Sequence, residues 1–126
     1  MNYKKISTEN APSAIGPYSQ GVKTNDTIYT SGQLPINVET GKLETDIRKA
    51  TEASIKNCKA IIESAGSSLK YVVKTLVFLK DMNDFAAMNE VYSSYFTENY
   101  PARSCVQVAK LPKDAVVEIE MIAVVE

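Results

Sequence analysis

The chain has 126 residues and a net charge of −1, with 44% hydrophobic and 23% charged residues. This size and composition predict one soluble domain, residues 1–126, with its own hydrophobic core. The 14 Lys and Arg residues are scattered, which argues against a nucleic-acid-binding protein. Because the sequence has neither a membrane-spanning apolar run nor the apolar region of a signal peptide, we expect a cytoplasmic protein that does not bind membranes.

The sequence contains no histidine, and this restricts its chemistry. The commonest general base at neutral pH and the commonest metal ligand are both missing. A Ser-His-Asp or Cys-His nucleophile is therefore excluded within one chain. The only two cysteines, Cys58 and Cys105, are far apart, so neither a disulfide framework nor a CxxC-type zinc site is expected. Proton transfer must use Glu, Asp, Tyr, Lys, backbone groups or water.

The first half of the chain predicts two strands and a helix. Short strands are expected at 18–24 and 27–31, around an Asn-Asp turn. Thr45-Asp46 offers an N-cap, and apolar residues then recur at helical spacing until Gly66 ends the helix as its C′ residue. Cys58 lies on the apolar stripe of this helix, where we interpret it as a small buried hydrophobic residue.

The second half predicts a strand, a helix and two further strands. A run rich in β-branched residues predicts a strand over 71–80. Asn83 or Asp84 caps a second helix, whose aromatic stripe is expected to face the core. Strands at 102–108 and 116–125 complete an α+β fold with a mixed sheet and both helices on one face. Because no element remains to cover the other face, we expect an oligomer whose sheets pack across subunits.

Arg103 stands where a strand is expected to begin, two residues after Pro101. The ordinary explanation is a solvated arginine at a strand end, with its stem over apolar surface. Two features favour a ligand site instead: the proline fixes the preceding backbone, and the strand that follows is apolar. A guanidinium at the edge of a dry pocket has the planar fork that matches a carboxylate.

Glu118 and Glu120 are expected on one face of the last strand, because side chains alternate along it. A polar solvent-facing surface is the usual explanation. The same face continues through Ile122 and Val124, however, and a face that is polar at one end and apolar at the other indicates a pocket rim or an interface. Burial would raise the pKa of Glu118 and a nearby arginine would lower it, and the sequence leaves both open.

Three further candidates have ordinary explanations when each is taken alone. Tyr18 in IGPYSQG and Ser31-Gly32 in TSGQLP lie in segments whose Gly, Pro and Ser residues build turns. Cys105 shares a strand face with Arg103 but has no histidine partner. It is therefore expected to line a pocket or to pack rather than to act as a nucleophile.

Four segments taken together resemble one known family. They are IGPYSQG, YTSGQLP, PARSCVQVAKLP and VEIEMIAV. The chain is similar over its whole length to the Rid family, also called the YjgF family, and in particular to its RidA branch. The stretch 101–119 carries the most specific part of the resemblance, whereas the loop at 97–100 is short.

The resemblance implies a fold, an assembly and an activity. Members have a chorismate-mutase-like α+β fold and form homotrimers with a central barrel of sheets and active sites between subunits. They hydrolyse reactive enamines and imines of amino-acid metabolism, such as 2-aminoacrylate and 2-iminobutanoate, to 2-oxo acids and ammonia. No metal, nucleotide or other cofactor is implied.

The resemblance also implies roles for individual residues. Arg103 would bind the substrate carboxylate, and Glu118 would position or deprotonate a water molecule with help from Ser31. Four other residues are implied to contact the substrate: Tyr18, Gly32, Asn89 and, through its main chain, Cys105.

Three alternatives remain open. A trimer that binds 2-oxo acids without turnover would use the same Arg103 pocket. An endoribonuclease or translation inhibitor is disfavoured by the near-neutral charge and by the lack of interleaved basic and aromatic residues. A chaperone-like or purely structural trimer would not require Arg103 and Glu118 to converge.

Overall fold

The computed structural model describes residues 3–125, which form one six-stranded mixed sheet and two α-helices. The strands are β1 (Tyr3–Ile6), β2 (Gly21–Thr24), β3 (Thr27–Thr30), β4 (Val72–Leu79), β5 (Ala102–Gln107) and β6 (Val117–Val124). The helices are α1 (Ile47–Ser64) and α2 (Phe85–Tyr95). The sheet order is β1-β2-β3-β6-β4-β5, with β4 and β5 parallel and the other neighbours antiparallel. The predicted α+β class with a mixed sheet is confirmed.

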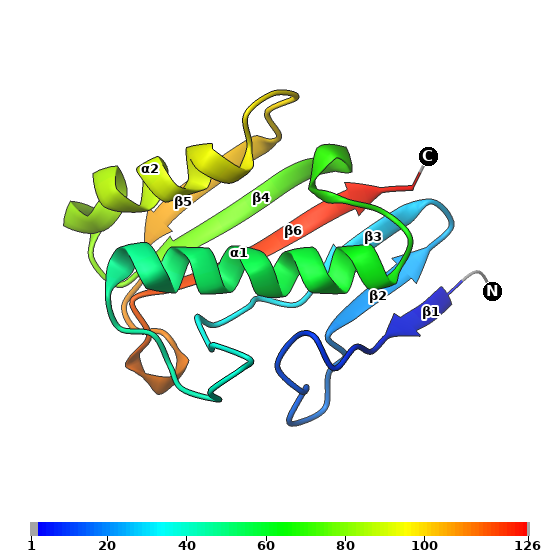
Figure 1. Ribbon diagram of the computed structural model, residues 1–126, viewed down its shortest axis with the longest axis horizontal. Coiled ribbons are helices and arrows are strands. Elements are labelled where there is room, and N and C mark those ends of the chain that lie inside the picture. Colours follow the sequence, from blue (N-terminus) through cyan, green and yellow to red (C-terminus); the bar gives the residue numbers. More distant parts are fainter. Residues whose placement is uncertain (1–2, 126) are drawn as a thin grey trace.

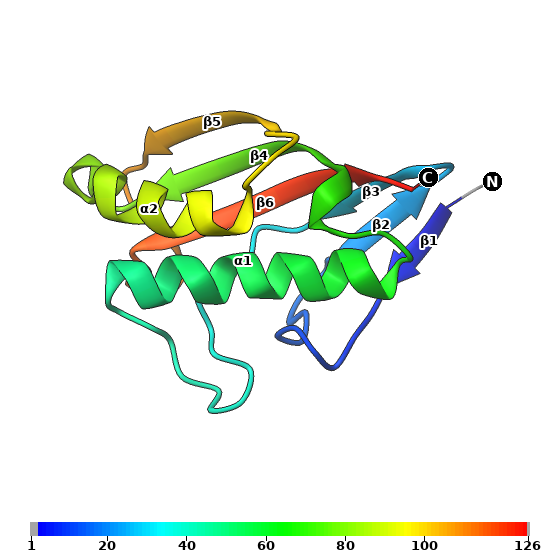
Figure 2. The ribbon, with the colours of Figure 1, turned by 45° about the horizontal axis from the view of Figure 1, so that its top comes forward.

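Both helices lie next to each other on the same face of the sheet, as predicted (Figures 1 and 2). The core between them and the sheet is formed by side chains that alternate along the central strands. Those that are fully buried on β4 and β6 include Val77, Leu79, Val117 and Ile119. No helix within residues 3–125 is long and apolar enough to cross a membrane.

The ends of α1 follow the sequence signals. The side chain of Asp46 accepts a hydrogen bond from the backbone N–H of Lys49 at 3.0 Å, which confirms the predicted N-cap. Gly66 has a φ of +91°, the left-handed conformation that glycine supplies after a helix. Cys58 is fully buried as predicted, and burial raises the pKa of its thiol to about 12.

Other boundaries differ from the sequence prediction. The strand expected at 18–24 begins only at Gly21, because the buried side chain of Gln20 bonds to the backbone of Thr8, Ala11 and Pro12 and holds an irregular loop. The edge strand β1 was not predicted, since its sequence YKKI is short, mostly exposed and without apolar alternation.

Two smaller differences concern the second half. The strand expected at 71–80 is shorter, because Leu69–Tyr71 forms a 3-10 turn before β4. Asp84 occupies the N-cap position of α2 but its side chain makes no capping bond there. Instead, Asp81 accepts from the N–H of Asn83 and caps the 3-10 turn that leads into the helix.

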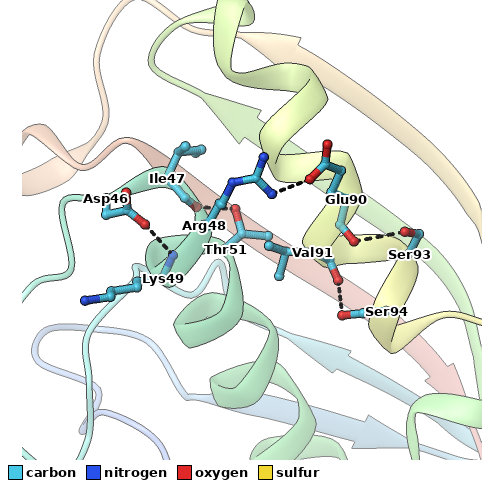
Figure 3. Close-up of polar contacts among 9 residues, drawn as sticks. All are labelled: Asp46, Ile47, Arg48, Lys49, Thr51, Glu90, Val91, Ser93 and Ser94. Atoms are coloured by element: carbon cyan, nitrogen blue, oxygen red, sulfur yellow. Dashed lines mark hydrogen bonds and ion pairs between the residues drawn. The ribbon is translucent and has the colours of Figure 1, made fainter.

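An ion pair joins α1 to α2 at the protein surface. Arg48 donates to the carboxylate of Glu90, and further bonds from Ser93 and Ser94 to carbonyls of α2 lie nearby (Figure 3). Both charged side chains are exposed, so solvent screens their attraction and the pair contributes little to stability.

The second face of the sheet carries no helix (Figure 2). Side chains of β3, β4 and β6 that alternate away from the core lie there, among them Tyr29, Leu76, Phe78 and Ile122, and none of these four is fully buried. The prediction that the chain leaves one sheet face without a covering layer is therefore confirmed for residues 3–125.

Candidate functional site

Arg103 lies beneath α2, on the helix-covered face of the sheet. It is the register partner of Thr75 on the neighbouring strand β4, so both side chains point to the same face. Its Nη1 donates to Oδ1 of Asn89 at 2.7 Å. The guanidinium carbon lies 4.6 Å from the ring centroid of Tyr92 and 5.5 Å from that of Phe85. Both distances are typical of cation–π contacts.

The three residues around Arg103 come from one stripe of α2. Phe85, Asn89 and Tyr92 are spaced i, i+4 and i+7, which places them on one helix face. The family resemblance identified Asn89 as a pocket residue, whereas the helical spacing of the aromatic residues assigned both rings to the core. The two rings could have been identified from the sequence, because they flank an asparagine at helical spacing and the next strand contains an arginine.

No carboxylate neutralises Arg103 within residues 3–125. The ion pairs recorded there involve Arg48, Lys56 and Lys80. A guanidinium carries five N–H donors, and Asn89 takes one of them. Arg103 is therefore a partly buried cation, held in place by an amide and two rings, with donors left to form a bidentate pair with an anionic ligand.

Cys105 lies two residues further along β5 and faces the same side as Arg103. Burial raises the pKa of its thiol, and the charge of Arg103 offsets this in part, so the thiol stays protonated at neutral pH. The N–H of Val108 donates to Leu79 on β4. Because peptide groups alternate in direction along a strand, the N–H and C=O of Cys105 project from the opposite, free edge of β5.

Glu118 lies on the opposite face of the sheet from Arg103. Buried Val77 is the register partner of both Cys105 and Ile119, which puts those two on the helix-covered face. Glu118 pairs with Phe78, one position along, and so projects from the face without helices. Burial raises the pKa of its carboxyl, and the like charge of Glu120 raises it further.

The turn at Ser31-Gly32-Gln33 is bound to β6 beside this carboxylate. The N–H of Gln33 donates to Ile119 at 2.8 Å, and that of Ile119 returns a bond at 3.2 Å. A Cβ on Gly32 would lie 2.5 Å from Oε2 and 2.8 Å from Cδ of Glu118, so any other residue here would displace the carboxylate. Glycine at this position is therefore what lets the turn contact the carboxylate.

Ser31 connects this turn to the loop that contains Tyr18. Its hydroxyl donates to the carbonyl oxygen of Ser19 at 2.5 Å, which leaves its oxygen free only to accept. Tyr18 is 53% exposed, and its own hydroxyl accepts from the N–H of Ile15 at 3.4 Å. Tyr18 thus presents a large exposed ring on a loop whose backbone is bonded to Ser31, and a ligand or a second chain could contact this ring.

The predicted residues thus form two groups on opposite faces of one sheet. Arg103, Asn89 and Cys105 lie on the helix-covered face. On the other face Glu118 lies with the Ser31-Gly32 turn, and Tyr18 lies on the adjoining loop. The single chain brings Arg103 into contact with Asn89 and places Gly32 beside Glu118, but it does not bring the two groups together.

Two hollows of the single chain lie away from these residues. One of about 400 Å³ separates α1 from the loop after β3 and is lined by Ile36, Glu44, Lys49 and Asn57 among others. Another of about 350 Å³ lies between Lys70 and Tyr100. Neither is lined by a predicted site residue. Within residues 3–125, no group of three or more Cys, Asp or Glu side chains is arranged to hold a metal ion.

Comparison with known proteins then decides the family. The family model described as Endoribonuclease L-PSP matches residues 8–125. The chain is 54% identical over 124 residues to the 2-iminobutanoate/2-iminopropanoate deaminase of Escherichia coli K12, which covers 96% of this chain and 97% of the relative. This chain belongs to the Rid (YjgF) family. The resemblance found in the four sequence segments is confirmed.

Other relatives agree with this membership. A RutC family protein of Pyrococcus abyssi is 55% identical over 124 residues, covering 98% of each chain. The crystal structure of E. coli TdcF with bound serine matches with a TM-score of 0.94 and 49% identity, over 98% of this Rid protein and 99% of that chain. The E. coli YjgF structure matches with a TM-score of 0.93 and 53% identity, over 96% and 98%. The predicted fold class is thereby confirmed.

Replacing Glu120 should lower the pKa of Glu118. Glu120→Gln removes a like charge from the same strand face, whereas burial, the larger cause of the shift, remains. The titration midpoint of Glu118, followed by ¹³C NMR of its carboxyl carbon, should therefore be lower in Glu120→Gln than in the natural protein. Glu63→Gln, on the exposed end of α1, is the control and should leave the midpoint unchanged. An unaltered midpoint in Glu120→Gln would contradict this electrostatic assignment.

Proposed function

We propose that this Rid protein is a hydrolytic deaminase of small 2-imino acids and their enamines, such as 2-iminobutanoate and 2-aminoacrylate, releasing 2-oxo acids and ammonia. The observation that carries the proposal is Arg103, a partly buried cation on an aromatic platform with no acidic partner within residues 3–125. Such a group fits the carboxylate common to these substrates. The names of the relatives described above support the same chemistry.

The reaction needs few groups, because a protonated imine already accepts water. Arg103 binds the substrate carboxylate, and the free carbonyl of Cys105 accepts a hydrogen bond from the imine N–H. Glu118 takes a proton from a water molecule as the water's oxygen bonds to the imine carbon. The oxygen of Ser31 accepts a hydrogen bond from the water's other hydrogen. Glu118 then returns that proton to the amino nitrogen of the resulting carbinolamine. The C–N bond breaks with its electron pair leaving on ammonia, and the hydroxyl group loses its proton to Glu118 as the C=O bond of the 2-oxo acid forms. Positioning supplies most of the advantage.

The substrate site is completed, in this proposal, by a second copy of the chain. Arg103 and Glu118 lie on opposite faces of one sheet and cannot meet within a subunit. A homotrimer with sites between subunits would place Arg103 of one copy against Glu118, Gly32 and Tyr18 of the next. The helix-free apolar face and the free edge of β5 support this assembly, because both leave surface that packing would bury.

Arg103→Ala should abolish activity while the fold stays intact. Loss of a bidentate, charge-assisted pair should lower kcat/KM by about 100-fold or more. The assay supplies a threonine dehydratase, threonine and semicarbazide, and follows the trapped imine and the released 2-oxobutanoate. Arg48→Ala is the matched control, since Arg48 is the chain's other arginine, exposed on α1. Full activity in Arg103→Ala, or no activity of the natural protein on either the threonine or the serine imine, would overturn the proposal.

Mixing two inactive variants should restore activity if sites lie between subunits. Arg103→Ala and Glu118→Gln chains, denatured together and refolded in equal amounts, form mixed trimers in which some sites receive both natural residues. Random assembly makes about a quarter of all sites complete, so about a quarter of the natural activity should return. Either variant refolded alone is the control. Refolded mixed trimers without activity would show that each site uses Arg103 and Glu118 of the same chain.

Two other functions are separated by direct measurements. In a protein that binds 2-oxo acids without turnover, Glu118→Gln would keep its ligand affinity, and neither the natural protein nor the variant would hydrolyse imines. In the proposed deaminase, the same variant should keep most of its affinity for 2-oxobutanoate but lose kcat. The description of the family model suggests ribonuclease activity as an alternative function. The net charge of −1 disfavours RNA binding. Steeply salt-dependent binding of RNA would support the ribonuclease alternative.

A further inference from the structure

Thr75 is a buried hydroxyl group next to the proposed substrate arginine. It lies in the middle of β4, is 0% exposed, and is the register partner of Arg103 on β5. Its Oγ1 lies 2.7 Å from the phenol oxygen of Tyr92. The ring of Tyr92 is in turn the nearer of the two rings on which the guanidinium of Arg103 lies.

We propose that Thr75, acting through Tyr92, is a positioning residue that fixes the orientation of the Arg103 guanidinium and thereby the affinity for the substrate carboxylate. The proposal rests on the proposed function, since it assumes that Arg103 binds that carboxylate. Thr75 itself does not touch substrate in this scheme. Its effect passes from the hydroxyl pair to the ring of Tyr92, and from that ring to the guanidinium.

The contacts of Arg103 explain why the position of Tyr92 matters. The guanidinium is held by three side chains of α2: the amide of Asn89 and the rings of Tyr92 and Phe85. Arg103 itself belongs to the sheet. The bond between Thr75 and Tyr92 links α2 to the strand beside Arg103, so it sets the height and tilt of the ring relative to the guanidinium.

Burial makes this bond difficult to replace. Tyr92 is only 7% exposed, and Thr75 is not exposed at all, so neither hydroxyl has ready access to water. A buried hydroxyl without a partner is costly, which confines the Tyr92 ring to positions that keep the bond. Bidentate binding of a carboxylate requires the guanidinium plane to be aligned, and a tilted ring would misalign it.

The alternative is that Thr75 and Tyr92 only stabilise the core. Variants that keep the shape separate the two roles. Thr75→Val removes the hydroxyl and preserves the branched side chain, Thr75→Ser keeps the hydroxyl, and Tyr92→Phe keeps the ring. Thr51→Val is the matched control: Thr51 is equally buried, and its hydroxyl bonds to a carbonyl of α1 rather than to a side chain near Arg103.

In steady-state kinetics with 2-iminobutanoate, Thr75→Val and Tyr92→Phe should each raise KM by about 5-fold or more, with a smaller change in kcat. Thr75→Ser should stay within about 2-fold of the natural protein, and so should Thr51→Val even if it unfolds at a lower temperature. The double variant Thr75→Val/Tyr92→Phe should resemble either single variant, because both remove the same bond. Equal KM values across the series would overturn the proposal.

NMR of the arginine side chains tests the relay without any enzyme assay. The sequence contains only two arginines, Arg103 and Arg48, so the ¹⁵Nε spectrum has two side-chain signals, and Arg48→Lys assigns them. In Thr75→Val, rotation of the Arg103 guanidinium should become faster, while that of Arg48 should not change. Unchanged rotation of Arg103 would refute the positioning role. Because this readout needs no substrate, it stands even if the natural protein proves inactive, which would overturn only the proposed function.

Discussion

The two-residue alternation of side chains in the sheet is the constraint on which the proposed site depends. Across β5, β4 and β6 the register places Arg103 and Cys105 on the helix-covered face and Glu118 on the other. A shift of one residue in either strand would exchange the faces of every side chain on it, including the buried ones, so the core fixes the separation strongly. The same pleat that packs Val77 under the helices keeps the cation and the acid apart within one chain. A site that uses both must lie where one copy's sheet edge meets another copy's open face.

The environments of Arg103 and Glu118 are set by different interactions. For Arg103, α2 supplies two rings and an amide, and no acidic side chain among residues 3–125 pairs with it, so the cation remains available. For Glu118 the cause is close packing. Gly32 lets its turn contact the carboxylate, and this contact reduces the access of water to the carboxylate. Neither device adds much to the stability of the chain. A partly buried cation without a counter-ion among residues 3–125 and a half-buried acid with a raised pKa are both costly, and such costs are typical of functional sites.

Features of the fold that depend on neighbouring residues were predicted from the sequence. The cap at Asp46, the glycine after α1 and the burial of Cys58 follow from short-range patterns, and the count of elements was enough to leave one sheet face without a cover. The loop around Gln20 and the edge strand β1 were not predicted, because each depends on bonds to distant backbone. The aromatic platform was missed for a related reason: Phe85 and Tyr92 have the spacing of core residues, and only the parallel pairing of β4 with β5 reveals that an arginine lies beneath them. The family resemblance named Arg103, Glu118 and Asn89, but alternation within single strands could not show that Arg103 and Glu118 lie on opposite faces, because that depends on the register between strands.

In the proposed assembly, the charges around Glu118 would make up for the absence of histidine. Within one chain, burial and Glu120 raise the pKa of Glu118. In the proposed trimer, the guanidinium of a neighbouring copy would oppose this and keep the carboxylate ionised while the site is empty. A bound substrate would bring a carboxylate that neutralises that guanidinium and, as a protonated imine, a positive charge that keeps Glu118 ionised. When the water's oxygen bonds to the imine carbon, the charge on nitrogen is lost, the pKa of Glu118 rises, and the carboxylate takes the water's proton. The loss of the imine's charge would thus drive a proton transfer for which many hydrolases rely on an imidazole.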